Sequence, residues 1–352
     1  MDVLLVSPSL RSTQASAFAS DALEGLSKAL RAVGVKATVV VPMNDDVLAS
    51  GLMLARRLTK IETPSGAKVV LHEGRLSNQA DLAVLELPDG APADSFASAV
   101  SAYAVVRGVS AVHFLGGSET GEGAVDAAAW NTATDTKLTH RYNPYRLWAK
   151  KQNQGVLAEE LGMSPDAAHT MVMVCSDAAS ESAARELVQA ALKSPCQFLV
   201  FAPESDVATV AAWYNELGDA ARVLSERADD LVRRAMSSAD LVVWARGTAM
   251  PVPFALRALR YAVVPVLPQV CAGSWSVSID PAATSGNAVL CTGADGDTLG
   301  NALTRALALV ASPSWEPLLR RVMTQETGWE RHARALKRAF GPQPDSAALA
   351  AV

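Results

Sequence analysis

The side chains that could bind a metal ion or act as a nucleophile are scattered along the chain. The four cysteines, Cys175, Cys196, Cys271 and Cys291, form no CxxC pair and no cysteine–histidine spacing typical of zinc sites. The chain contains no HExxH motif of a zinc hydrolase and no GxSxG elbow of a serine hydrolase. We therefore expect reduced, buried thiols, no metal site and no cofactor.

The histidines show no close ligand pairing either, and most are expected to be structural or surface residues. His113 is the exception, because it ends the strand-like run AVHFL. Open parallel α/β sheets bind their ligands at the carboxyl ends of strands. We therefore keep His113 as a candidate for a ligand-binding cleft. The other histidines are His72, His140, His169 and His332.

Two loops are placed where a phosphate group could bind. The first strand-to-helix turn, SPSLRSTQASAF, contains no glycine, so the backbone cannot approach a dinucleotide pyrophosphate closely there. The loop GGSETGEG is rich in glycine but lacks the Lys-Ser/Thr pair of a phosphate loop. We therefore expect no dinucleotide site, and interpret the second loop as a flexible connection.

Short apolar runs alternate with helical segments along most of the chain, as in VLLV, TMVMVC and DLVVWA. Strands of this kind, without polar alternation and separated by helices, predict parallel sheets covered on both faces. The alternation breaks near 120–160 and then restarts. The pattern predicts an α/β protein with two tandem Rossmann-like domains at 1–145 and 146–324. We expect a terminal helix at about 325–340 that can pack back on the first domain, and a disordered tail at 341–352.

The composition narrows the class of protein further. The chain has 352 residues, 50% of them hydrophobic, and a formal net charge of −5. Nucleic-acid binding needs a clustered basic surface, so an acidic chain of this kind argues against it. No apolar segment is long enough to span a bilayer, so we expect no membrane insertion. The expected location is the cytoplasm.

The segment WNTATDTKLTHRY, continued by AKKQNQGVLAEELGM, carries a specific resemblance. It is similar to the pattern WNPATDxxLxxxY...GKxxNKxxLQxELGL of the bacterial glycogen/starch synthase family. The segments ALRYAVVPVL and WEPLLRRVMTQETGWERHA, with LSKALRAVGVKATVVVP near the start, also resemble family segments. The resemblance extends over the whole chain, although the first domain is shorter than in the family. It implies a GT-B fold, in which two Rossmann-like domains have parallel sheets that face a cleft.

The family transfers glucose with retention from a nucleotide-glucose donor, so its site residues can be compared with this chain one by one. The KTGGL loop after the first strand, which supplies a lysine and glycine amides, falls on the segment that contains Ala15, Ala17 and Phe18. Asp21, which follows, is retained. The resemblance therefore implies that this loop has lost both its charge and its glycines.

The family's phosphate-binding motif SRLxxQKG falls on VCSDAASESAAREL, with an ambiguity of one residue. Its arginine corresponds to a serine or to Asp177, and its lysine to Glu181 or Ser182. On either placement no cation remains and carboxylates are close, which would repel a diphosphate.

Three further positions of the family pattern change. The sugar-binding glutamate of EPCGL corresponds to Ala249, and TGGL retains at best Gly273. HxHDW retains only its first histidine, His113, and the later TVHN segment has no counterpart. Arg246 and Thr248 lie near the lost glutamate, so they join Asp21, His113 and Gly273 as remaining candidates for the cleft.

These losses favour a pseudoenzyme: a glycogen-synthase-like GT-B scaffold kept for interaction with an unidentified protein partner, for assembly or for regulation. They argue against nucleotide-sugar or glucan binding. A first alternative is an active retaining hexosyltransferase with a changed site, in which Arg246 and the following helix start attract an anion. A second is a non-catalytic binder of glycan or nucleotide. Its stacking aromatics would be Trp213, Tyr214, Trp244 and Trp275.

Overall fold

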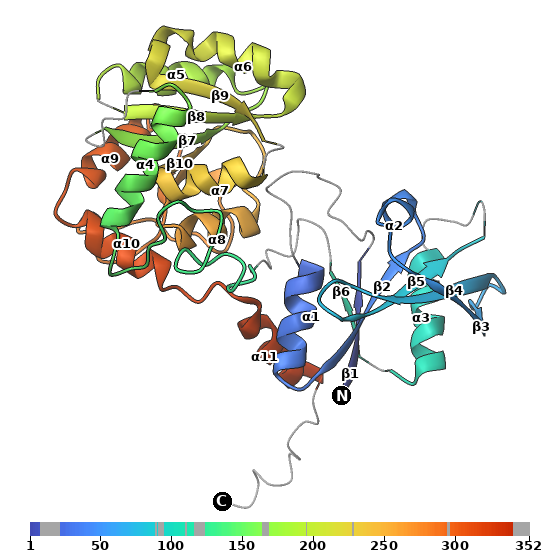
Figure 1. Ribbon diagram of the computed structural model, residues 1–352. Helices are drawn as coiled ribbons and strands as arrows, with labels where there is room; N and C mark the ends of the chain where they lie inside the picture. The colour runs from blue at the N-terminus through green and yellow to red at the C-terminus, as the bar shows by residue number, and fades with distance from the viewer. Residues whose placement is uncertain are drawn as a thin grey trace, which may run out of the picture. The chain divides into compact units, whose positions relative to one another are not determined.

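The computed structural model describes residues 1–7, 22–88, 90, 95–109, 111–115, 124–163, 169–194, 196–226, 229–293 and 296–340. The chain forms two compact units (Figure 1). The first contains the chain up to Asp126 and again from Gly328, and the second contains Ala127–Thr327 within the described ranges. Each unit has its own six-stranded sheet. Within the described ranges, no helix is both long and apolar enough to cross a membrane.

The first unit has a mixed sheet in the order β3-β4-β5-β2-β1-β6. Strands β1, β2, β5 and β6 are parallel, whereas β4 is antiparallel to both of its neighbours. The predicted parallel sheet is therefore confirmed for these four strands, whereas β3 and β4 form an antiparallel hairpin at one edge in place of a helical crossover. The strands are β1 (Asp2–Val6), β2 (Lys36–Pro42), β3 (Ala55–Glu62), β4 (Lys68–Arg75), β5 (Asp81–Glu86) and β6 (Ala111–Phe114).

Helices cover both faces of this first sheet. Val3 and Leu5 of β1 face a cluster that includes α1 (Ala22–Ala32) and α11 (Trp329–Phe340), whereas Leu4 and Val6 face α3 (Ser95–Arg107). This alternation follows from the two-residue period of a strand. A short helix, α2 (Asp45–Ala49), is capped by the side chain of Asn44.

The second unit has a fully parallel sheet in the order β12-β11-β10-β7-β8-β9. Its central strands are buried along almost their whole length, as continuous apolar runs predict. The strands are β7 (Thr170–Cys175), β8 (Cys196–Ala202), β9 (Ala221–Ser225), β10 (Leu241–Trp244), β11 (Val264–Pro268) and β12 (Val289–Cys291). The helices are α4 (Trp148–Glu160), α5 (Glu181–Ala191), α6 (Val207–Tyr214), α7 (Asp229–Ser238), α8 (Val252–Arg260), α9 (Leu299–Val310) and α10 (Trp315–Met323), with the 3₁₀ turns η1 (Glu204–Asp206), η2 (Asn215–Ala220) and η3 (Gln269–Cys271).

The boundary between the units differs from the predicted one. The chain passes between them at Asp126/Ala127 and at Thr327/Gly328, and not at residue 145. Residues 127–147 belong to the second unit because Trp130, Asp135 and Tyr142 pack against its helices. The predicted disordered tail, 341–352, lies outside the described residues.

Candidate functional site

The carboxyl ends of the second sheet are where a parallel α/β fold places its ligands. The sequence puts charged or polar residues just beyond four of these strand ends. Ser176 follows β7, η1 follows β8, Glu226 follows β9 and Arg246 follows β10. This edge therefore brings together the residues that would decide whether a phosphate group can bind.

Arg246 lies at this edge, and its guanidinium is engaged by the protein itself. Its guanidinium forms an ion pair with Glu226, and its Nε donates to the carbonyl oxygen of Ser176 at 3.2 Å. The guanidinium carbon also lies 5.2 Å from the centroid of the Trp244 ring. The Arg246 and Glu226 side chains are only 12% and 14% exposed, so the ion pair is largely shielded from water. A phosphate would have to compete with a carboxylate for this arginine.

Carboxylates accept hydrogen bonds from the turn between β7 and α5. Asp177 Oδ1 accepts from the backbone N–H of Ala179 at 3.1 Å and from the hydroxyl of Ser180 at 2.6 Å. Asp206 Oδ2 accepts from the N–H of Ala178 at 2.9 Å. This hydrogen bond, with a second from Ser205, lowers the pKa of Asp206. The amides of this turn, which could bind an anion, are thus occupied by the chain's own acids.

The remaining predicted positions of this unit add no anion-binding group. Ala249 is exposed, and the carbonyl oxygen of Thr248 accepts from Trp244 Nε1 at 2.7 Å. Helix α8 carries a proline in its first turn, which removes one of the N–H donors of its amino terminus. A Cβ on Gly273 would lie 2.9 Å from the Trp275 ring, so this glycine makes room for the indole.

The remaining predicted residues lie in the first turn of α5, in the first unit, or outside the described residues. Glu181 pairs with Arg185 along the surface of α5, and Ser182 is exposed on the same helix. His113 is in β6 of the first unit, paired with Leu5 of β1. The predicted positions Ala15, Ala17, Phe18 and Asp21, and the glycine-rich loop 116–123, lie outside the described residues.

The carboxylates at this end of the sheet, which we call the acidic edge, are Asp177, Asp206 and Glu226. The sequence did not single out Glu226 or Asp206. Both follow strands of the parallel sheet, and this position was the only signal that could have found them. The burial of Trp244 and Tyr214, both about 2% exposed, removes them as surfaces on which a sugar could stack. Among the described residues, no group of three or more histidine, cysteine or acidic side chains is placed to hold a metal ion.

The four cysteines are free and buried, as predicted. Burial raises the pKa of the Cys175 thiol and of the Cys196 thiol to about 12. A thiol acts as a nucleophile through its thiolate, so neither group is reactive near neutral pH.

The segment with the strongest family resemblance, 130–142, packs against the helices of the second unit. Trp130 is 4% exposed, and the guanidinium carbons of Arg233 and Arg257 lie 3.7 and 4.3 Å from its ring centroid. Asp135 accepts from the hydroxyl of Tyr261 and pairs with Arg233 at 3.3 Å. These contacts fasten the segment to α7 and α8.

The ammonium of Lys150 is buried beside the same segment. Among the described residues, its hydrogen-bond acceptors are backbone carbonyl oxygens and not carboxylates. Its Nζ donates to the carbonyl oxygens of Met236 at 2.9 Å and Tyr261 at 2.7 Å, and lies 5.7 Å from the ring centroid of Tyr142. Burial lowers the pKa of this ammonium from 10.5 to about 7, although Asp240 opposes the shift.

The lowered pKa of Lys150 makes the stability of the protein depend on pH. Between pH 7 and 10 the unfolded chain keeps a proton on Lys150 that the folded chain releases, so this group adds stability as the pH rises. The free energy of unfolding relative to that of Lys150→Met should grow by about 2–3 kcal/mol from pH 7 to pH 9. Urea unfolding of both proteins at each pH measures this difference, and parallel pH profiles would refute it. Buried tyrosines and cysteines titrate in both proteins, so their contributions cancel.

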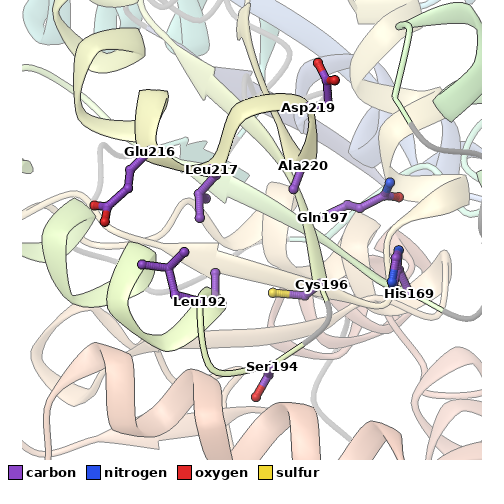
Figure 2. A pocket seen from close by; sticks show the side chains of 10 residues that line it. His169, Leu192, Ser194, Cys196, Gln197, Glu216, Leu217, Asp219 and Ala220 are labelled. Carbon is purple, nitrogen blue, oxygen red and sulfur yellow. The ribbon is translucent and has the colours of Figure 1, made fainter.

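A pocket of about 370 Å³ lies at the opposite edge of the sheet, by the amino ends of β8 and β9 (Figure 2). Among the described residues that line it there is no Trp, Tyr or Phe for a sugar to stack on, and no Lys or Arg for a phosphate. The lining residues are His169, Ala191, Leu192, Ser194, Cys196, Gln197, Glu216, Leu217, Asp219 and Ala220. Because the pocket lies at the amino ends of the strands, it is separate from the candidate site at their carboxyl ends.

Comparison with known proteins identifies the fold. No family model and no curated protein matches the sequence. Among solved structures, the catalytic domain of starch synthase IV from Arabidopsis thaliana, bound to ADP and acarbose, has a TM-score of 0.71 at 15% identity, with 96% of this chain and 97% of that chain covered. Anabaena Alr3699/HepE, in complex with UDP and glucose, has a TM-score of 0.53 at 12% identity, with 97% and 99% covered.

A third structure is sucrose-phosphate synthase from Thermosynechococcus elongatus, with a TM-score of 0.50 at 14% identity and coverage of 97% and 98%. The chain therefore has the GT-B fold of glycosyltransferases, as the resemblance predicted. At these identities the likeness establishes the fold and not the activity.

Proposed function

We propose that this protein is a cytoplasmic, non-catalytic GT-B protein that serves as a scaffold for interaction with another protein. One observation carries the proposal. At the carboxyl edge of the second sheet, Arg246 is held by Glu226, and the turn amides are held by Asp177 and Asp206. Transfer from a nucleotide-sugar needs preorganised cations or donors on the departing diphosphate. In this chain Arg246 is paired with a carboxylate and the turn amides donate to carboxylates, which supports the proposal.

The likeness to a starch synthase bound to ADP makes ADP-glucose the first donor to test, with UDP-glucose as the second. We expect neither hydrolysis nor transfer to a maltooligosaccharide above the rate without protein. Product that forms with the native chain and disappears in Arg246→Ala would establish an active glycosyltransferase with an altered site. It would overturn the proposal.

A second prediction concerns the affinity of the acidic edge for ADP. In the double variant Asp206→Asn/Glu226→Gln, Arg246 loses its carboxylate partner and one further negative charge is removed. We expect the affinity for ADP to rise by about tenfold or more, since a negative charge close to the phosphate groups repels them. Calorimetric titration measures the change.

A matched control for this variant changes two acids elsewhere in the same unit. Asp219→Asn/Glu316→Gln removes the same net charge from η2 and α10. An equal gain in both double variants would mean that overall charge, and not the arrangement at this edge, limits ADP binding.

A further inference from the structure

Two exposed aromatic side chains lie together on the second unit. The chain contains seven tryptophans and five tyrosines, and all of them are among the described residues. The others are buried or half-buried, whereas Tyr145 and Trp148 are 83% and 64% exposed. Tyrosine and tryptophan rings are costly to leave in water and are enriched where a protein binds a partner. The only two exposed rings of these types therefore indicate a binding surface.

Both rings lie at the amino-terminal end of α4 (Figure 1). Trp148 is the first residue of the helix, and Tyr145 lies in the turn before it. The backbone N–H of Arg146 donates to the carbonyl oxygen of Asn143 at 2.9 Å, so this turn is already wound like a helix. Residues three apart in such a turn share one face. The opposite side of α4, which includes Leu157, is buried, and the helix packs on α7.

Gln152 extends this face by one helical turn. It lies four residues after Trp148 and is exposed. Within the described part of the chain, no hydrogen bond engages its amide, which carries two donors and one acceptor. We call Tyr145, Trp148 and Gln152 the aromatic face. It combines two apolar ring surfaces with neutral hydrogen-bonding groups and has no formal charge.

The size and charge of the aromatic face argue against two classes of partner. A stable protein interface buries about 800 Å² on each side, whereas two aromatic rings supply about 150–250 Å² each. Trp148 is the only large apolar side chain exposed on the described helix α4. A single-stranded nucleic acid stacks its bases on such rings but needs a positively charged groove along its backbone. The aromatic face carries no cation.

A chain of uncharged sugars fits what the aromatic face offers. A sugar ring has apolar C–H groups on its faces, which leave water when they stack on an aromatic ring. Its hydroxyl groups lie around the edge and need donors and acceptors of the kind that the Gln152 amide and the Tyr145 hydroxyl supply. Neither partner carries a formal charge, so no ion has to be desolvated.

We propose that Tyr145, Trp148 and Gln152 form a binding surface for a neutral polysaccharide. The inference goes beyond the proposed scaffold function, because it would attach the scaffold to a carbohydrate. The surface is also not part of the family resemblance. Tyr145 and Trp148 fall in the gap that the pattern WNPATDxxLxxxY...GK leaves between its tyrosine and its GK pair.

The test is electrophoresis of the full chain through non-denaturing gels that contain amylopectin, dextran, hydroxyethylcellulose or galactomannan. We expect at least one of these polysaccharides to retard the native chain. The affinity, obtained from mobility at several polysaccharide concentrations, should fall by about tenfold or more in Tyr145→Ala/Trp148→Ala. Gln152→Ala should lower it by about threefold. Tyr145→Phe/Trp148→Phe keeps both rings and should lose less than Tyr145→Ala/Trp148→Ala.

Two matched controls separate the aromatic face from other causes of retardation. Phe114→Ala/Phe340→Ala removes two exposed rings from the first unit, and Arg146→Gln removes the cation of the same turn. Each should change the affinity by less than about twofold. All substituted side chains are exposed, and melting temperatures check that the variants stay folded.

Three results would overturn the inference. The first is no retardation of the native chain in any of the four gels. The second is equal retardation of Tyr145→Ala/Trp148→Ala, which would place the polysaccharide at another site. The third is self-association of the native chain in sedimentation velocity that disappears in the same variant, which would assign the aromatic face to a second copy. The gels contain no nucleotide-sugar, so measured transferase activity would overturn the proposed function without changing this result.

Discussion

Replacing Trp130 with alanine is expected to lower the free energy of unfolding of the second unit by about 4–5 kcal/mol. The indole is 4% exposed and touches the guanidinium groups of Arg233 and Arg257, with the Tyr261 ring edge-on at 5.9 Å. Alanine would leave a cavity and remove both cation–π contacts from two arginines that are themselves largely buried. Urea unfolding followed by circular dichroism measures the change.

Trp130→Phe is the control for this effect, because it keeps an aromatic face while it removes volume. Trp130→Phe should lower the free energy of unfolding by less than half as much as Trp130→Ala does. A loss below about 1 kcal/mol for Trp130→Ala would contradict the anchoring role of this segment.

Replacing Arg260 with alanine should destabilise the second unit by about 3–5 kcal/mol. Its guanidinium donates to the carbonyl oxygens of Trp130 at 2.7 Å and Ala127 at 2.8 Å, and to Thr327 Oγ1 at 3.3 Å. Ala127 and Thr327 are the residues at which the chain enters and leaves this unit. Arg260 therefore connects α8 to both points at which the chain passes between the units. Its replacement would leave the carbonyl oxygens of Trp130 and Ala127 without their charged donor.

The variant Arg260→Lys keeps the positive charge at this position but removes the planar guanidinium group. A single ammonium cannot reach three acceptors that are arranged around a planar fork, so lysine should recover less than half of the lost stability. Limited proteolysis near residues 127 and 327 should speed up in both variants. Full stability of Arg260→Lys would show that charge without the fork is sufficient, and would contradict this role.

Much of the fold could be predicted from local sequence. Strands such as β7 and β8 are apolar on both faces, and only a parallel sheet covered by helices buries such strands completely. The segment around Trp130 was recognisable because its residue types are fixed by contacts that specify them: Asp135 for Arg233 and Tyr261, and Thr132 for the carbonyl oxygen of Tyr142.

Other features depend on contacts between residues far apart in the chain. Strand β3, ARRLTKIE, is exposed at every residue but one, so it carries no apolar pattern, and its antiparallel pairing to β4 was missed. The ion pair of Arg246 with Glu226 joins the ends of two strands twenty residues apart. Sequence could place Arg246 near a site but could not show that a carboxylate already holds it.

We propose that the carboxyl edge of the second sheet does not bind a nucleotide diphosphate. Calorimetric titration of the native chain with ADP tests it most directly. We predict no saturable heat up to about 1 mM ADP, a limit that corresponds to a binding free energy weaker than about −4 kcal/mol. Saturable binding at or below that concentration, lost in Arg246→Ala, would contradict the claim and show that Arg246 leaves Glu226 to bind phosphate.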